Sequence, residues 1–332
     1  MQLLLRKTGF AHDREMRVVV IGGSGHIGSY LSPQLVEAGH TVTCVCRGIR
    51  PPYQEHPAWE QIHRVILDRT EEEARGTFGS AIAALHAEVV IDLTCYQPSS
   101  AEQLATALRG RVRHFLHCGT IWVHGHSVEV PTREDTPREP FGDYGCRKLV
   151  IERYLLDEFR STGFPATVLH PGHLVGPGWT PINPAGNFNP DVFTALASGQ
   201  EVLLPNLGME TLHHVHASDV AAGFVQAIGA GEAAFGESFH VVSPAALTLR
   251  GYAEQMAKWF GRQAVLRFLP WEEWRALQSE KDARVTYDHI ARSPNCSIEK
   301  ARRVIGYAPR YSSLEAVQES VEWLIEQGSR PS

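Results

Sequence analysis

Residues Arg17 to Gly39 read RVVVIGGSGHIGSYLSPQLVEAG, and this stretch decides the fold. An uninterrupted apolar run, Val18 to Ile21, leads into three glycines spaced three apart. Such a run is typical of a strand that is buried on both faces of a parallel sheet. Apolar residues then recur at roughly helical spacing. The stretch therefore predicts a strand, a glycine-rich loop and a helix.

Each of the three glycines has a separate expected role in that loop. Gly22 permits the tight turn, Gly25 lets the backbone approach a pyrophosphate, and Gly28 lets the helix pack close to the sheet. Free N–H groups at the start of the helix attract the anion. An ordinary tight turn is the alternative, because the chain has 29 glycines. The order of strand, loop and helix favours a bound dinucleotide.

Further apolar runs alternate with helical patterns along the chain. This alternation predicts an α/β fold, a Rossmann-type doubly wound parallel sheet. After Gly172 the pattern breaks up, and the Gly, Pro and Asn residues of 176–190 predict a long loop. The predicted strands are 17–21, 42–47, 65–68, 88–94, 114–120, 165–172 and 237–243, and predicted helices include 144–159, 247–260, 271–278 and 314–326.

The length of 332 residues exceeds what one minimal nucleotide-binding domain needs. We predict a dinucleotide-binding domain at 16–172, to which 237–243 returns. Residues 173–236 and 244–330 would form a smaller, discontinuous C-terminal substrate-binding lobe. Residues 1–15 hold only three consecutive leucines, too few for a signal peptide, and are predicted to be a disordered leader.

Composition narrows the classes of function. The net charge of −6, with 20% charged residues, disfavours capture of nucleic acid or of an anionic membrane. The six cysteines show no C-x-x-C pairing, which predicts free thiols and a cytoplasmic protein. His213, His214 and His216 cluster, but no Cys or carboxylate accompanies them at zinc-like spacing. No metal site is predicted.

The GxxGxxG spacing resembles that of the short-chain dehydrogenase/reductase superfamily. Over residues 16–324 the chain is similar to its extended subfamily, the NAD-dependent epimerase/dehydratase type. Two departures are His124 in place of a usual Tyr and His170 where Arg is commoner. The motifs that carry the resemblance are CGTIWVHG (118–125), YGCRK (144–148), HPGHLVGPG (170–178), HHVHASDVA (213–221) and the terminal segment that begins CSIEKARRVIGY (296–307).

The resemblance implies an NAD(P)-dependent oxidoreductase that transfers hydride at a carbinol or carbonyl carbon of a sugar or sugar-like molecule. Thr120, Tyr144 and Lys148 would be its catalytic residues, and the protein would be a homodimer. Tyr144 and Lys148 are four apart and share a helix face. The ammonium would therefore lower the pKa of the phenol. Thr120 would hydrogen-bond the substrate oxygen and fix it for the transfer.

Arg47 ends the second predicted strand, where an Asp or Glu would hold the ribose hydroxyls of NAD. A guanidinium suits a 2′-phosphate, so NADP is preferred over NAD. Asp68 is expected either to contact adenine or to serve as a turn residue. The expected cofactor-binding residues are Gly22, Ser24, Gly25, His26, Ile27, Gly28, Arg47, Asp68, Thr94, Tyr144 and Lys148; the candidate substrate contacts are His173, Trp179, Asn183, Asn187 and His214.

The sequence also bears on three alternatives to this oxidoreductase. Ile121 and Trp122 stand where the related dehydratases place an Asp-Glu pair, so a 4,6-dehydratase is not expected. A redox-neutral sugar epimerase with tightly held NAD is the main alternative. A non-catalytic member that senses NADP or binds nucleic acid belongs to another class. The intact set of Thr120, Tyr144 and Lys148 argues against it.

Overall fold

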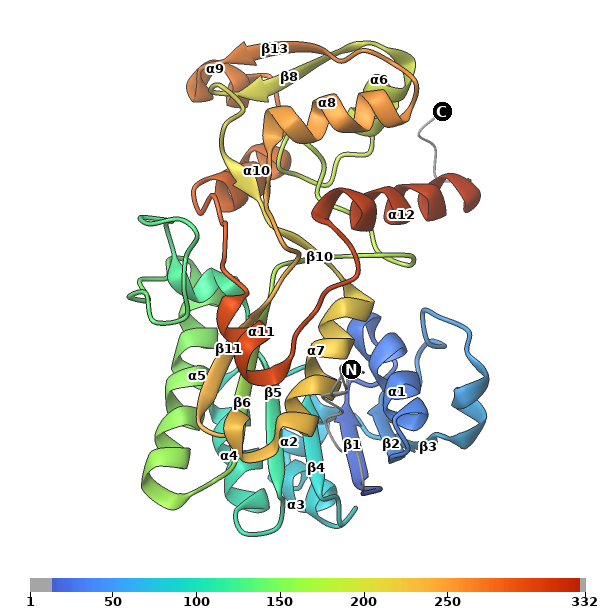
Figure 1. Ribbon diagram of the computed structural model, residues 1–332, viewed down its shortest axis with the longest axis vertical. Coiled ribbons are helices and arrows are strands. Elements are labelled where there is room, and N and C mark those ends of the chain that lie inside the picture. Colours follow the sequence, from blue (N-terminus) through green and yellow to red (C-terminus); the bar gives the residue numbers. More distant parts are fainter. Residues whose placement is uncertain (1–13, 329–332) are drawn as a thin grey trace, which may run out of the picture.

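The computed structural model describes residues 14–328, so nearly all of the predicted leader lies outside the described residues. Seven parallel strands form one sheet in the order β11-β6-β5-β4-β1-β2-β3 (Figure 1). The predicted α/β Rossmann-type fold is confirmed. The strands are β1 (Arg17–Ile21), β2 (Thr41–Cys46), β3 (His63–Ile66), β4 (Val89–Asp92), β5 (His114–Cys118), β6 (Ala166–Pro171) and β11 (Glu237–Val241).

Helices cover both faces of this sheet. On one face, apolar residues of the strands pack with helices α1 (His26–Glu37), α7 (Ala217–Ala230) and α11 (Glu299–Ile305). On the other face they pack with α3 (Phe78–Ala83), α4 (Pro98–Leu108) and α5 (Asp143–Thr162). The short helix α2 (Arg69–Ala74) follows β3. This layering explains why the strands are apolar on both sides.

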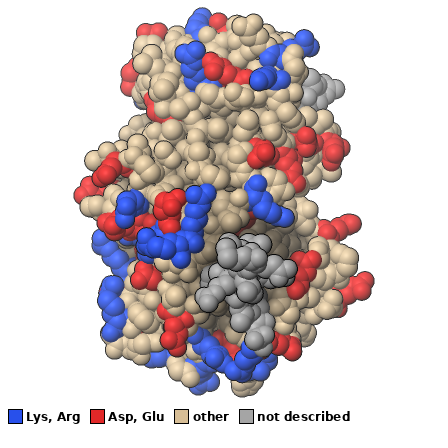
Figure 2. All heavy atoms as spheres, in the orientation of Figure 1, with Lys and Arg blue, Asp and Glu red and all other residues tan. Residues whose placement is uncertain are grey.

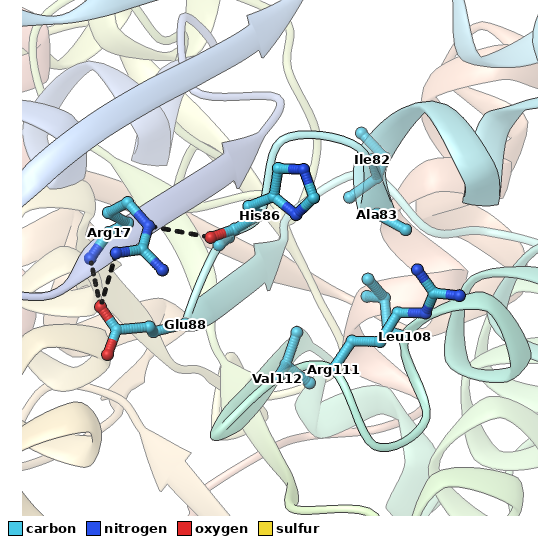
Figure 3. Close-up of a pocket in the computed structure, with 9 residues that line it drawn as sticks. Arg17, Ile82, Ala83, His86, Glu88, Leu108, Arg111 and Val112 are labelled. Atoms are coloured by element: carbon cyan, nitrogen blue, oxygen red, sulfur yellow. Dashed lines mark hydrogen bonds and ion pairs between the residues drawn. The ribbon is translucent and has the colours of Figure 1, made fainter.

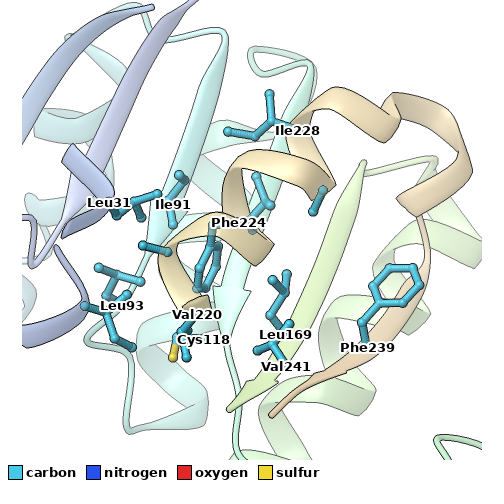
Figure 4. Packing of buried hydrophobic residues seen from close by; sticks show 14 of the residues in the cluster. Leu31, Ile91, Leu93, Cys118, Leu169, Val220, Phe224, Ile228, Phe239 and Val241 are labelled. Atoms are coloured by element: carbon cyan, nitrogen blue, oxygen red, sulfur yellow. The ribbon is translucent and has the colours of Figure 1, made fainter. Parts of the chain in front are cut away.

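Helix α7 differs from the predicted division of the chain. Its residues fall within 173–236, which we predicted to be part of the second lobe. Phe224 and Val220 instead point toward Leu31 of α1 and Leu169 of β6 in a shared core (Figure 4). Burial of an apolar helix face against the sheet outweighs the nearness of the second lobe in the sequence.

The C-terminal region has its own apolar cluster, which includes Tyr252, Trp274 and Val317. Figure 1 shows most of it on the far side of the molecule from α3 and α4. Across residues 14–328, none of the helices combines the length and apolar character needed to cross a membrane. The elements of the C-terminal region are β7 (His173–Val175), α6 (Asp191–Ser198), β8 (Glu201–Pro205), β9 (Thr211–Leu212), β10 (His214–His216), β12 (Leu247–Thr248), α8 (Leu249–Trp259), β13 (Val265–Leu269), α9 (Trp271–Ala276), α10 (Glu280–Ile290) and α12 (Ser313–Glu326).

Most of the chain's 17 histidines are buried. Burial lowers the pKa of several of them, because an imidazolium loses its hydration in the protein interior. The pKa falls to about 3 for His114 and His214, and to about 4 for His213 and His289. These imidazoles are therefore neutral in the folded protein.

We expect the free energy of unfolding to decrease steeply as the pH falls below about 6.5, the ordinary histidine pKa. The unfolded chain then binds protons that the folded chain excludes until about pH 4, so stability rises with pH across that window. Each such histidine contributes about 1.4 kcal/mol per pH unit.

Urea unfolding at several pH values between these limits measures the effect. His114→Leu should reduce the slope, because it removes one buried imidazole, which contacts Thr167 and lies at the start of β5, away from the strand end that leads to Thr120. Equal stability at neutral pH and at pH 5 would contradict the expectation.

Candidate functional site

The glycine-rich loop joins β1 to α1 with little room for side chains. Gly22 has φ +83°, and a Cβ on it would lie 2.5 Å from Cγ2 of Thr94. A Cβ on Gly28 would lie 2.5 Å from the carbonyl oxygen of Gly22. Gly25 is less confined, with only that same oxygen nearby, at 3.1 Å. Helix α1 starts after Gly25 with no side-chain cap, which leaves its first N–H groups available to an anion.

A cavity of about 530 Å³ opens beside this loop, at the ends of β1, β2 and β3. It brings together six of the predicted cofactor contacts, Gly22, Ser24, Gly25, Arg47, Asp68 and Thr94. The other three loop residues, His26, Ile27 and Gly28, lie buried in the first turn of α1. Sequence reasoning missed Arg50, Arg69 and Tyr96, which also line the cavity.

Asp68 lines this cavity and also caps a helix. Its Oδ1 accepts hydrogen bonds from the N–H groups of Thr70, at 2.9 Å, and Glu71, at 3.2 Å. The prediction that Asp68 serves as a turn residue therefore explains the contacts of one of its carboxylate oxygens, Oδ1. The capping contact also explains why β3 ends at Ile66, two residues before the predicted boundary.

Arg69, which lines the cavity, forms a part-buried ion pair with Asp92. Nη1 of Arg69 lies 2.7 and 2.9 Å from the two carboxylate oxygens of Asp92, which is fully buried. Desolvation opposes the charge of Arg69, but Asp92, Cys95 and Glu73 together outweigh it and raise the pKa of Arg69. The sequence held a signal for this pair, a lone acidic residue at the end of the apolar run that forms β4.

A second, smaller hollow of about 200 Å³ lies elsewhere, near the start of β1 (Figure 3). There Nε of Arg17 donates to the carbonyl oxygen of His86, and Nη1 lies 3.6 Å from Oε2 of Glu88. None of the predicted site residues lines it. Because ligands of such sheets bind beyond the carboxyl ends of the strands, this hollow is not the candidate site.

Thr120, Tyr144 and Lys148 come together beyond β5 and at the start of α5. Lys148 is buried, and its Nζ donates to the carbonyl oxygens of Cys95, at 2.8 Å, and Cys118, at 2.6 Å. The Nζ atom lies 5.9 Å from the ring centre of Tyr144. Tyr144 also hydrogen-bonds the side chain of Thr120. The three predicted catalytic residues therefore form one constellation.

The expected effect of Lys148 on Tyr144 is wrong for this structure. The pKa of Tyr144 is raised, chiefly by desolvation and also by Cys118 and Tyr96, while the hydrogen bond from Thr120 acts in the lowering direction. Tyr144 is nevertheless 42% exposed as a residue. Lys148 does not offset the desolvation, because its ammonium is directed to two backbone carbonyls.

An aromatic wall, Trp122 with His173 and His289, stands next to Tyr144. The Trp122 and Tyr144 rings meet edge to face with centres 5.9 Å apart. Nε1 of Trp122 donates to Nε2 of His173 at 3.4 Å, and His289 lies edge-on to both rings. The guanidinium of Arg292 lies 3.8 Å above Trp122. His214 lies behind this wall, 5.8 Å from His173, and is fully buried.

The remaining substrate candidates fall into two groups. Trp179 is 38% exposed and stacks on His26 at 5.0 Å between ring centres, so it lies beside the glycine loop. Asn183 and Asn187 are buried and hydrogen-bond each other, and Asn187 also donates to Thr286. These two amides hold the long loop together. Within residues 14–328, no group of three metal-ligating side chains is placed to hold an ion.

The chain is similar in sequence to several known proteins. The model of the NAD dependent epimerase/dehydratase family matches residues 18–241. The chain is 25% identical over 317 residues to the chloroplast stem-loop binding protein of 41 kDa b of Arabidopsis thaliana, which covers 92% of this chain and 78% of that protein. It is 27% identical over 267 residues to 2′-dehydrokanamycin reductase of Streptomyces kanamyceticus, covering 80% and 72%.

Among solved structures, UDP-glucose 4-epimerase of Thermotoga maritima with UDP-glucose has a TM-score of 0.71 at 21% identity. The match covers 94% of this chain and 99% of that chain. Because the family model spans more than half of the sequence, the chain belongs to the NAD dependent epimerase/dehydratase family. The cofactor typical of that family is NAD(P).

Two glycine substitutions should separate cofactor binding from folding. Gly25→Val directs a branched side chain toward the cavity and should weaken NADPH binding at least about 100-fold, or about 2.8 kcal/mol. Gly28→Ala instead forces a Cβ against backbone 2.5 Å away. It should lower the free energy of unfolding by about 1 to 3 kcal/mol.

Calorimetric titration with NADPH measures the first effect and urea unfolding the second. Gly110→Ala is a control for mutation of a loop glycine, because a Cβ there meets nothing within 4 Å, although its φ of +71° carries a local strain. Wild-type NADPH affinity in the Gly25→Val protein would place the dinucleotide elsewhere.

Proposed function

We propose that this member of the NAD dependent epimerase/dehydratase family is an NADP-dependent reductase or dehydrogenase. Its reaction is hydride transfer at a carbinol or carbonyl carbon of a sugar or sugar-like molecule. The observation that carries the proposal is the joint position of Thr120, Tyr144 and Lys148 beyond the carboxyl end of β5. A binding protein without chemistry has no need of that constellation.

Three residues of the chain each have a separate role in the proposed reaction. Tyr144 gives a proton to the carbonyl oxygen during reduction and takes it back during oxidation. The Thr120 hydroxyl hydrogen-bonds that oxygen and orients it. Lys148 anchors α5 to the strand ends and is the residue that would hold the nicotinamide ribose. When bound, NADPH would supply the hydride for reduction and NADP+ would accept it in oxidation, and the oxidised form would add positive charge to the site.

That charge matters because the pKa of Tyr144 is raised in the protein alone. A phenol with a raised pKa is a weaker acid and is almost fully protonated at neutral pH, so the proton needed for reduction is present while the phenolate needed for oxidation is scarce. We therefore place Tyr144 in the reducing direction as a proton donor. For oxidation, the positive charge of the oxidised cofactor would have to lower the pKa of Tyr144.

Two exposed arginines support NADP over NAD. Arg47 and Arg50 both line the cavity beside the end of β2. The guanidinium of Arg50 lies 4.6 Å from the ring centre of Tyr53. Within the part of the chain that the structure describes, neither arginine forms an ion pair with a carboxylate, so both are free to receive a 2′-phosphate.

The aromatic wall beside Tyr144 favours a reductase or dehydrogenase over a dehydratase. Trp122 fills a position where an acid for dehydration would stand, and it packs against Tyr144. The relative named 2′-dehydrokanamycin reductase supports a reductase activity. A redox-neutral epimerase remains the alternative within the same site, since epimerisation needs no acid or base beyond Tyr144.

The stem-loop binding relative supports a second candidate function, binding of structured nucleic acid. Nucleic-acid binding relies on basic surfaces. On the face shown in Figure 2, acidic and basic side chains are interspersed. We therefore rank this candidate below the oxidoreductase.

Tyr144→Phe removes the transferable proton and keeps the ring that packs against Trp122. Turnover should fall by about 10²-fold or more, the usual scale of acid-base assistance. The measurement is NADPH oxidation with a panel of keto-sugars, together with NADPH affinity by calorimetry. Val150→Ala, at an exposed position of the same helix, is the control. Wild-type turnover in the Tyr144→Phe protein would overturn the mechanism.

Arg47→Asp should invert the cofactor preference toward NAD. In the wild type, charge-assisted hydrogen bonds from the Arg47 guanidinium to the 2′-phosphate would contribute about 1.5 to 3 kcal/mol to the binding of NADP. The carboxylate repels phosphate and accepts hydrogen bonds from free ribose hydroxyls. The readout is the ratio of NADPH to NADH dissociation constants in both proteins. If the wild type binds the two cofactors equally, the NADP assignment fails and the epimerase alternative gains.

A further inference from the structure

A buried histidine lies directly behind Thr120. The backbone N–H of Thr120 donates to Nδ1 of His170 at 3.0 Å. Nε2 of the same imidazole lies 3.1 Å from Oε1 of Glu152. His170 is fully buried on β6, and Glu152 is 2% exposed on α5. The pair therefore joins β6 and α5 to the turn that follows β5.

These contacts determine which nitrogen of His170 carries the proton. A ring nitrogen that accepts from an N–H group has no proton of its own, so Nδ1 is unprotonated and Nε2 is the donor. Nε2 donates to the Glu152 carboxylate, which also lies 2.8 Å from Nη2 of Arg138. Burial acts to raise the pKa of Glu152, but the hydrogen bond from His170 and the charge of Arg138 act to lower it. The acceptor is ionised.

The imidazole also packs tightly against the peptide that it bonds. A Cβ on Gly119 would lie 2.4 Å from Nδ1 of His170, so only glycine fits there. Thr120 is extended, with φ −166° and ψ 146°, and its Oγ1 also accepts from the N–H of Trp122 at 3.3 Å. The backbone of Thr120 is therefore held from its N–H side by His170, while its side chain is left to meet Tyr144.

An arginine at position 170 would lack this contact, because a guanidinium has five donors and no acceptor. Histidine supplies the one lone pair that the buried N–H of Thr120 needs, and an unsatisfied buried N–H destabilises the conformation that buries it. The identity of residue 170 thus affects Thr120 through its acceptor and not through its charge.

We propose that His170, held by Glu152, is a positioning residue that sets the backbone of Thr120 so that its hydroxyl faces Tyr144. The inference rests on the proposed function for its catalytic consequence. The hydrogen bonds and the tautomer of His170 do not depend on the proposed function. The substrate is a carbonyl compound reduced at the site of Tyr144, and His170 touches neither substrate nor cofactor.

Two variants test the role. His170→Leu removes both the acceptor and the donor, and should lower kcat at least about tenfold with KM and NADPH affinity changed less than about twofold. His170→Asn places an amide at the position of Nδ1 and should restore kcat to within about threefold of wild type, because the amide oxygen can accept the Thr120 N–H. His114→Leu, a buried histidine at the other end of β5, is the control for loss of an imidazole.

A second experiment, by nuclear magnetic resonance, does not depend on turnover. Long-range proton–nitrogen spectra of histidine-labelled wild type should show one residue, absent from the His170→Asn spectrum, with a bare Nδ1 and a protonated Nε2. An imidazolium or an Nδ1–H tautomer at neutral pH would overturn the proposal, whether or not the leucine variant folds. Equal losses of kcat in the leucine and asparagine variants would also overturn it. Absence of NADPH-dependent turnover in wild type, with the tautomer as stated, would instead refute the proposed function.

Discussion

The site depends on one buried cation. Lys148 is 2% exposed, and an ammonium in that position is tolerated only when its donors are paired. Its partners are the carbonyl oxygens of Cys95, just beyond β4, and Cys118, at the end of β5. These two bonds fix α5 against the carboxyl ends of neighbouring strands. Tyr144, one turn earlier on the same helix face, is thereby placed above the sheet where Thr120 begins its turn.

This arrangement changes how the tyrosine works. A lysine four residues away was expected to lower the pKa of the phenol, yet the ammonium of Lys148 serves the backbone and the pKa of Tyr144 is raised. The protein alone therefore holds the proton on Tyr144. In the proposed reaction, the positive charge of an oxidised nicotinamide would favour the base form of Tyr144.

Histidines line and support the candidate site. His170 stands where the resemblance leads one to expect Arg, and it supplies an acceptor to Thr120. His173 accepts from Trp122 beside Tyr144, and burial and neighbouring histidines lower its pKa well below the ordinary value. The imidazole and indole groups of the aromatic wall offer hydrogen bonds and ring faces beside Tyr144. The same burial makes the fold sensitive to acid.

The sequence by itself determined the parallel sheet, the glycine loop and the identity of Thr120, Tyr144 and Lys148 as candidates. Apolar runs, glycine spacing and an i, i+4 pair are local patterns, and they survive into the fold. Only the tertiary structure decided what these residues touch. The contacts of His170 with Thr120 and of Lys148 with Cys95 join residues 50 and 53 positions apart. Likewise, α7 lies against α1 rather than in the second lobe, because burial of apolar surface is settled by neighbours in space and not along the chain.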